Sequence, residues 1–261
     1  MTAEPLVWFE VRERVAILTI ANPPANTLSM ATLDALESAF RRALKDSVMK
    51  VIVITGQGKL FCAGADVGEL ATLRTREQAE ALSQKGQTLC DLIEMSSKPV
   101  IAAINGSYAL GGGNELLMAC HLRLAEESTQ LGSPEVRLGL MVGWGGSQRL
   151  PRLVGAGRAL DLLLTGRRLT SQEAHAIGLV NRVVEDGTVL AEAVALARQL
   201  AALSAPTLEA TLDAVRVGLR EGFERGQETE TTRFGLLCEN RDWQEGTRAF
   251  MEKREPHFTD R

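Results

Sequence analysis

The sequence of 261 residues predicts an α/β fold, because short apolar runs alternate with stretches in which apolar residues recur at helical spacing. Three of these runs are typical of buried strands, namely Val15–Ile20, Val51–Thr55 and Pro99–Ile104. From residue 190 onward the pattern predicts one helix after another. We therefore expect a mixed core domain over residues 1–197 and a C-terminal helical region over residues 198–261.

The first expected helix begins after Ser29, whose hydroxyl can accept a hydrogen bond from the first turn. Its apolar residues recur at helical spacing and predict a buried stripe, made of Leu33, Leu36, Phe40 and Leu44. A loop followed by a second helix is expected between Leu70 and Met95. Further along, Thr170–Ala174 has the capping pattern of another helix start, and Gly178–Val184 predicts a short strand.

Composition and charge exclude several classes of function. The net charge is −4 and there is no block of basic residues, so nothing favours a nucleic-acid partner. The N-terminus lacks a basic start followed by an apolar run, and no stretch of about 18 apolar residues occurs. We therefore expect no secretory signal, no membrane span and a cytoplasmic location.

Cysteine and histidine usage indicates neither disulfides nor a metal site. The four cysteines, Cys62, Cys90, Cys120 and Cys238, form no CxxC pair and predict reduced, mostly buried thiols. The three histidines are scattered without the spacing of metal ligands. The chain also lacks a GxGxxG dinucleotide fingerprint, a GKS or GKT phosphate loop and a GxSxG nucleophile elbow.

A glycine-rich stretch from Asn105 to Leu150 carries the chemistry that the sequence suggests. A short apolar run is followed by Gly111, Gly112 and Gly113, and then by the start of a helix. Free backbone N–H groups at such a helix start favour an anion or a developing oxyanion. Glu115 falls in this first turn, where it is either a functional carboxylate or a residue that merely complements the helix dipole.

A second carboxylate, Glu135, follows within the same stretch and precedes a cluster of glycines. Two carboxylates beside one oxyanion site can divide acid and base work between them. Sequence spacing does not show that Glu115 and Glu135 meet in space. Glu135 can equally be an exposed glutamate in a turn.

The segment Phe61–Asp66 is built of small residues, which suits a backbone that approaches a ligand closely. Cys62 within it is a competing candidate for a nucleophile. No histidine lies nearby in the sequence to activate it, and buried, inert cysteine is much more common.

Several of these segments resemble the signatures of the enoyl-CoA hydratase/isomerase (crotonase) superfamily. The segments Ala109–Leu116, Pro134–Gly139 and Gly145–Leu150 match in order and spacing, and Phe61–Asp66 resembles the FxAGAD motif. The resemblance covers residues 6–258. It implies a crotonase-like spiral of ββα units, with C-terminal helices that relatives use for trimerisation.

The resemblance also implies the site and the reaction. Ala65 and Gly112 correspond to the two N–H donors of the oxyanion hole, and Glu115 and Glu135 to the acid–base pair of hydratases. The positions expected to contact the CoA thioester are Ala63, Gly64, Ala65, Asp66, Val67, Gly111, Gly143 and Trp144. The expected reaction is reversible syn addition of water to a trans-2-enoyl-CoA, giving a 3-hydroxyacyl-CoA. Coenzyme A is then part of the substrate, no other cofactor is expected, and the assembly is a homotrimer or homohexamer.

Other members of the superfamily stay open as alternatives: an enoyl-CoA isomerase, an acyl-CoA decarboxylase, a branched-chain hydratase, or a CoA- or RNA-binding relative with residual activity. Three positions depart from the usual pattern. Val142 precedes Gly143 where relatives usually have proline, and Gly68 stands where many carry a lysine near the CoA phosphates. Trp144 occupies a position that is small in many hydratases, so it either narrows the acyl pocket or simply packs.

Overall fold

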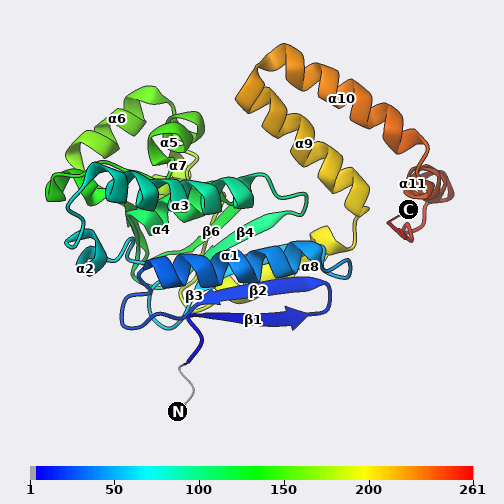
Figure 1. Ribbon diagram of the computed structural model, residues 1–261. Helices are drawn as coiled ribbons and strands as arrows, with labels where there is room; N and C mark the ends of the chain where they lie inside the picture. The colour runs from blue at the N-terminus through cyan, green and yellow to red at the C-terminus, as the bar shows by residue number, and fades with distance from the viewer. Residues whose placement is uncertain (1–3, 261) are drawn as a thin grey trace.

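The computed structural model describes residues 4–260, and its centre is a six-stranded sheet (Figure 1). The strands lie in the order β1-β2-β3-β4-β6-β9; β1 pairs with β2 antiparallel, and the other neighbours pair parallel. Their bounds are β1 Val7–Arg12, β2 Val15–Ile20, β3 Val51–Gly56, β4 Val100–Ile104, β6 Leu122–Glu126 and β9 Arg182–Val184. The three strands expected from apolar runs are thereby confirmed as β2, β3 and β4.

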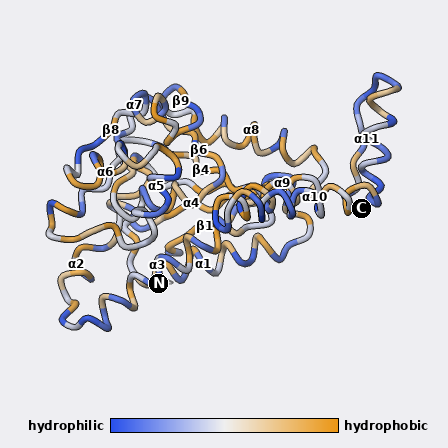
Figure 2. Tube along the Cα trace, turned by 90° about the horizontal axis from the view of Figure 1, so that it is seen from above, coloured by the Kyte–Doolittle hydropathy of each residue, from blue (hydrophilic) through white to orange (hydrophobic). Residues whose placement is uncertain are grey.

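The central strands are buried on both faces, which explains why their sequences are continuously apolar rather than alternating. Ile17 and Val53 face one hydrophobic cluster together with helix α8 (Val189–Ala201). Leu18 and Phe40 belong to a larger cluster on the other side, which includes helices α1 (Met30–Lys45) and α3 (Arg76–Glu94). The hydropathy colouring shows β4 as a hydrophobic trace at the centre of the molecule (Figure 2).

The helix starts follow the capping signals in the sequence. The Ser29 hydroxyl accepts a hydrogen bond from the Thr32 N–H at 3.2 Å, as expected for the start of α1. Thr170 and Glu173 form a reciprocal capping box at the start of α7. The remaining helices of the core are α2 Val67–Leu70, α4 Gly112–Ala119, α5 Gly146–Val154, α6 Ala156–Thr165 and α7 Ser171–Ala176.

A second, three-stranded sheet positions the glycine-rich stretch. Its strands are β5 Tyr108–Leu110, β7 Gln130–Gly132 and β8 Arg168–Thr170. β5 and β7 are parallel, and Cys62 forms a further parallel bridge with Ala109 of β5. Three parallel segments therefore end at the same edge, and helix α4 and the 3₁₀ helix η1 (Pro134–Leu138) begin just beyond it.

The C-terminal helices α9 (Ala205–Glu221), α10 (Phe223–Cys238) and α11 (Arg241–Glu252) project from the core in Figure 1. α9 returns to the core where Arg216 donates to the Met95 carbonyl at 3.0 Å. The expected domain division at residue 197 falls within α8 and stays a prediction.

Among residues 4–260, no single helix is both long and apolar enough to cross a membrane. α8 and α9 pass that test of length and composition only when taken together across their bend of 106°.

Candidate active site

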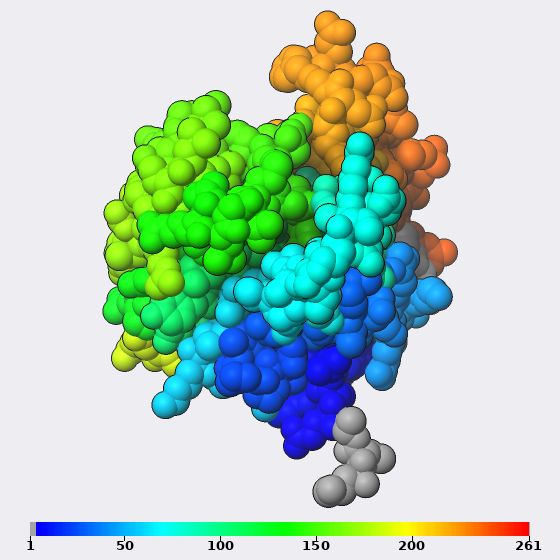
Figure 3. All heavy atoms as spheres, turned by 60° about the vertical axis from the view of Figure 1, so that its left-hand side comes forward, coloured from blue at the N-terminus to red at the C-terminus, as the bar shows by residue number. Residues whose placement is uncertain are grey.

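One cavity of about 760 Å³ brings together four of the residues that the sequence singles out. Ala65, Gly112, Glu115 and Glu135 all line it. In the space-filling view, the cyan segment around residue 75 lies beside the green segment around residue 140, with the orange C-terminal helices above (Figure 3). The two carboxylates and the two expected N–H donors therefore share one site.

These residues converge because of the parallel register of the small sheet. Leu110 pairs with Gly132, so the chain leaves β5 and β7 side by side. Glu115 follows in the first turn of α4, and Glu135 follows in η1. The parallel bridge between Cys62 and Ala109 brings the segment that leads to Ala65 to the same edge.

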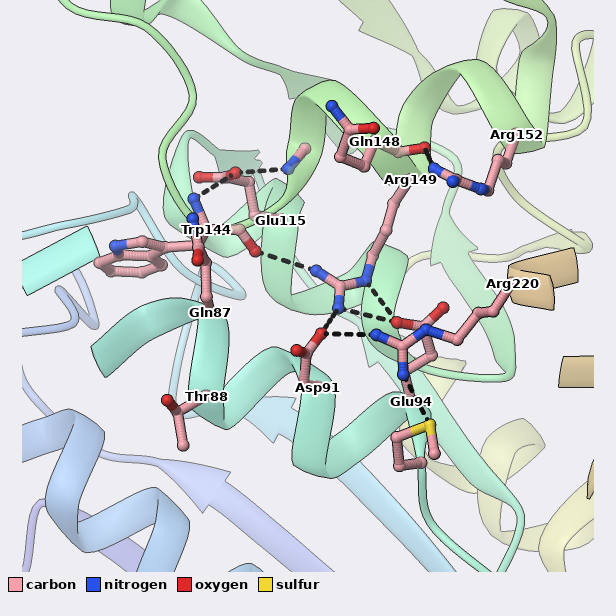
Figure 4. A network of polar contacts seen from close by, with 12 residues as sticks. Gln87, Thr88, Asp91, Glu94, Glu115, Trp144, Gln148, Arg149, Arg152 and Arg220 are labelled. Carbon is pink, nitrogen blue, oxygen red and sulfur yellow. Dashed lines mark hydrogen bonds and ion pairs between the residues drawn. The ribbon is translucent and has the colours of Figure 1, made fainter. Parts of the chain in front are cut away.

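Glu115 is buried, and one of its carboxylate oxygens is held by the backbone of a glycine-rich turn. Oε1 accepts hydrogen bonds from the Trp144 N–H at 2.8 Å and the Gly146 N–H at 2.7 Å (Figure 4). Burial raises the pKa of Glu115 to about 7, and the nearby Glu135 adds to the rise, while the two N–H groups oppose it. A carboxyl with this pKa can act as a general base or acid near neutral pH.

Glu135 is half-buried, and its carboxyl has fewer hydrogen-bond partners than that of Glu115. Within the described chain its Oε2 is buried and has no hydrogen-bond partner. Burial raises the pKa of Glu135 above its usual range. A raised pKa brings the protonated form of Glu135 closer to neutral pH, which suits a group that exchanges a proton with a substrate. Gly111 leaves room for it, since a Cβ there would lie 3.3 Å from Glu135 Oε1.

Ala65 and Gly112, the two residues expected to supply the N–H donors of an oxyanion hole, both line the cavity. Gly112 is the first residue of α4, so its N–H has no acceptor within the helix. Gly64 has φ +104°, and a Cβ on it would lie 3.2 Å from the Gly112 nitrogen. The segment ending at Ala65 therefore runs directly against the start of α4, and the role of the two N–H groups as oxyanion donors stays a prediction.

Trp144 lines the cavity and packs against two glycines, so it does pack, while a narrowing of the acyl pocket stays a prediction. A Cβ on Gly86 of α3 or on Gly112 would lie 2.2 Å from its ring. Gly143 also lines the cavity, and its carbonyl accepts a hydrogen bond from the Ser83 hydroxyl at 2.6 Å.

The other positions expected to contact CoA lie outside the lining of this cavity. Ala63 and Val67 are exposed, whereas Gly64 is buried against neighbouring backbone and Gly111 is buried beside the Glu135 carboxyl. Asp66 caps the short helix α2 by accepting from the Glu69 N–H at 3.0 Å. Their roles in binding CoA stay predictions.

The structure argues against Cys62 as a nucleophile. Its side chain is fully buried, and this burial raises the pKa of the thiol to about 12. Cys62 instead packs against Gly113, where an added Cβ would lie 2.9 Å from its sulfur.

Sequence reasoning gave no individual role to three polar residues that support the site. The Asn26 amide donates to the carbonyls of Gln57 and Leu60, both at 2.9 Å, and so fixes the turn before the segment that leads to Ala65. Asn114 donates to Ser133 at 3.1 Å, linking α4 to the start of η1. Arg149 is buried between α3 and the turn that contacts Glu115 (Figure 4). Asn114 stands in the segment Ala109–Leu116 and Arg149 in Gly145–Leu150, which could have marked them, whereas Asn26 lies in neither.

Comparison with known proteins places this site in a family. The sequence model described as enoyl-CoA hydratase/isomerase matches residues 10–261. The chain belongs to the enoyl-CoA hydratase/isomerase family. A probable enoyl-CoA hydratase of Bacillus subtilis (strain 168) is 43% identical over 95% of this chain and 96% of that protein. A crotonyl-CoA hydratase of Syntrophomonas wolfei is 40% identical, covering 95% of this chain and 96% of the relative.

Solved structures of family members confirm the expected crotonase-like fold. The crystal structure of an enoyl-CoA hydratase from Bacillus anthracis superposes with a TM-score of 0.93 at 36% identity, covering 98% of this chain and 100% of that one. An enoyl-CoA hydratase subunit from Geobacillus kaustophilus gives the same TM-score and identity, covering 98% of each chain. The match extends over the C-terminal helices as well as the core.

Burial of Glu115 makes the stability of this family member depend on pH. The pKa is about 7 in the folded protein and near 4.5 in the unfolded chain, so the unfolded chain loses this proton at lower pH. Stability contributed at this position is therefore lost as pH rises from about 4.5 to 7. Relative to Glu115→Gln, the wild type should lose on the order of 3 kcal/mol over this range. Urea unfolding of both proteins at several pH values measures the difference, and parallel curves would contradict the prediction.

Contact between Gly112 and the Trp144 ring predicts strong coupling between the two positions. Gly112→Ala forces a methyl group into the indole and should cost about 1–3 kcal/mol of unfolding free energy. In a Trp144→Ala background the ring is absent, and the same substitution should cost little. A double-mutant cycle by urea unfolding tests this. Equal costs in the two backgrounds would show that the ring does not constrain Gly112.

Proposed function

We propose that this protein is an enoyl-CoA hydratase that adds water reversibly, with syn geometry, to a trans-2-enoyl-CoA. The observation that carries the proposal is the pairing of Glu115 and Glu135, two carboxyls with raised pKa values, in one cavity with two backbone N–H donors. The named hydratases at 43% and 40% identity support the same reaction.

The oxyanion site would act on the thioester. Its carbonyl oxygen would accept hydrogen bonds from the Ala65 and Gly112 N–H groups, which stabilise the enolate that forms as water adds. Losing one such donor typically costs about 3 kcal/mol in the transition state. Fixed backbone donors suit this task, because they need no reorganisation when charge develops on the oxygen.

The two glutamates would divide the proton transfers. Ionised Glu115 would orient a water molecule and take its proton as the oxygen bonds to the β-carbon. The electrons of the double bond pass to the thioester oxygen, and protonated Glu135 delivers its proton to the α-carbon. Glu115 then returns its proton, and Glu135 regains one, through solvent. The pKa of about 7 lets Glu115 alternate between both states near neutral pH.

The cavity favours acyl groups of limited size in this proposal. The Trp144 ring packs against Gly86 and Gly112, and Trp144 lines the cavity, so a bulky side chain takes up space there that a smaller residue would leave open. One relative at 40% identity is named a crotonyl-CoA hydratase. We therefore propose short enoyl-CoA thioesters as the preferred substrates.

The alternative functions differ in whether they need a second carboxyl group in the site. An isomerase needs one carboxyl to move a proton between carbons, so a second buried glutamate would have no task. A decarboxylase requires no base for water, and a binding relative requires no acid–base pair at all. The presence of both glutamates in one cavity favours hydration.

This reaction needs neither a metal nor a separate cofactor, because the carboxyls and N–H groups supply the acid, the base and the electrophile. We propose that the enzyme works in the cytoplasm. The cysteines of the described chain are free thiols, and only Cys238 is exposed, which suits a reducing compartment.

Hydration of crotonyl-CoA provides the direct test. The purified wild type should remove the absorbance of the conjugated enoyl thioester. Glu115→Gln and Glu135→Gln should each lower the rate by roughly 10²–10⁴, because each variant loses one proton-transfer group. Longer, branched and β,γ-unsaturated thioesters run alongside identify the alternatives. Absence of activity in the wild type on crotonyl-CoA would exclude the short-chain hydratase.

We also propose that the chain assembles as a homotrimer or homohexamer through its C-terminal helices. Large apolar side chains on these helices are exposed in the single chain: Val215, Leu219, Phe223, Phe234, Leu236, Phe250 and Met251. Phe250 is 85% exposed and Met251 is 76% exposed, more than a monomer surface usually leaves for such residues.

Light scattering after gel filtration tests the assembly. The wild type should have a mass three or six times the 28.2 kDa of one chain. Phe250→Glu should shift the protein toward smaller species, because a charge would be buried in the interface. Leu164→Glu, which changes an exposed apolar residue of α6 on the other side of the molecule in Figure 1, is the matched control. A monomeric wild type would contradict the proposal.

A further inference from the structure

Arg149 lies at the centre of a polar network behind the cavity (Figure 4). It belongs to α5 and is only 8% exposed. Its Nε and Nη2 donate to Glu94 of α3 at 3.0 and 2.8 Å, and Nη2 also donates to Asp91 at 2.5 Å. The remaining nitrogen, Nη1, donates to the Trp144 carbonyl at 2.9 Å. One planar side chain therefore ties the turn before α5 to helix α3.

That turn, Val142–Gly146, is folded around the guanidinium. Gly145 has φ +100°, and a Cβ on it would lie 2.2 Å from Nη1 of Arg149. The Trp144 carbonyl faces Arg149, while the N–H groups of Trp144 and Gly146 face Glu115 Oε1. The same few peptide groups thus connect the arginine on one side to the carboxylate on the other.

We propose that Arg149 is a positioning residue, which holds the Val142–Gly146 turn in the conformation that aims two N–H groups at Glu115. It does not contact the reacting atoms in this proposal. The kinetic consequence rests on the proposed hydratase function, whereas the effect on the Glu115 carboxyl does not.

The arrangement of charges indicates that Arg149 acts through the turn rather than through its own field. Asp91 and Glu94 both pair with the guanidinium and offset its charge, and Arg220 adds a second cation 3.6 Å from Asp91. Glu115 itself is near Glu135, and the buried Cys90 thiol, whose pKa is raised by burial, is near both Glu115 and Arg149. The direct hydrogen bonds to Glu115 come from the turn.

Carboxyl-carbon NMR titration of Glu115 tests the proposal without substrate, with the signal assigned by its loss in Glu115→Gln. Arg149→Gln should raise the midpoint by about one pKa unit, because the turn no longer presents both N–H groups. Arg149→Lys keeps the charge but lacks the planar fork, so it should raise the midpoint too. Arg152→Gln is the matched control, since Arg152 donates to the Gln148 carbonyl rather than to the turn.

A second variant disturbs the turn without removing the arginine. Gly145→Ala places a Cβ against Nη1 at a backbone angle that favours glycine, and it should raise the Glu115 midpoint in the same direction. If Arg149→Gln fails to fold, Gly145→Ala and Arg149→Lys still test whether Arg149 positions the turn. An unchanged midpoint in Gly145→Ala, a wild-type midpoint in Arg149→Lys, or an equal shift in Arg152→Gln would overturn the proposal.

The rate measurement adds a kinetic readout in the assembled enzyme. For a base that must be ionised, the acid limb of the pH profile of kcat/KM follows the pKa of Glu115. A rise of about one unit from 7 should lower kcat/KM about fivefold at pH 7 and leave it little changed well above the pKa. A uniform loss at every pH would point to general damage instead. If the wild type hydrates nothing, the hydratase proposal fails while the NMR result still stands.

Discussion

The parallel pairing of three short segments is the constraint on which the site depends. β5 and β7 have only three residues each, and Cys62 contributes a single bridge, yet together they align the carboxyl ends that lead to Glu115, Glu135 and Ala65. A shift of one residue in either pairing would turn these groups to other faces. The large sheet forms the buried core, and the small sheet fixes where Glu115, Glu135 and Ala65 lie.

One buried and one half-buried carboxyl make this arrangement unfavourable for the stability of the fold. Glu115 is partly compensated by the Trp144 and Gly146 N–H groups, and Glu135 has one oxygen without any partner in the described chain. The protein therefore keeps two groups whose charged forms are disfavoured in the folded state. Such raised pKa values are common where a side chain must exchange protons near neutral pH. Arg149 fits this interpretation, because it holds the backbone that limits the rise at Glu115.

The sequence predicted the elements with strong patterns and missed those that depend on long-range pairing. β2, β3 and β4 were predictable because strands buried on both faces are continuously apolar. β6 was not, since Arg123 interrupts its pattern; the arginine is buried only because its guanidinium donates to the Leu179 and Cys120 carbonyls. The sequence identified both glutamates as candidates. It did not show that they meet in space, because this depends on the pairing of β5 with β7, and strands of three residues show no periodic pattern. Family resemblance supplied that placement, and the cavity confirms that they share it.

The glycines of the site also have a physical reason that the sequence alone did not reveal. Glycine near a ligand usually indicates close backbone approach, yet here Gly86 and Gly112 also face the ring of Trp144, on opposite elements. A large side chain at position 144 is therefore possible only because both neighbours lack a Cβ. The ring contacts Gly112 and the Trp144 N–H binds Glu115, so one residue that departs from the family pattern touches both an expected oxyanion donor and an expected acid–base residue. A substitution at Gly86 would therefore press on this ring from a helix that carries none of the four residues expected to perform the chemistry.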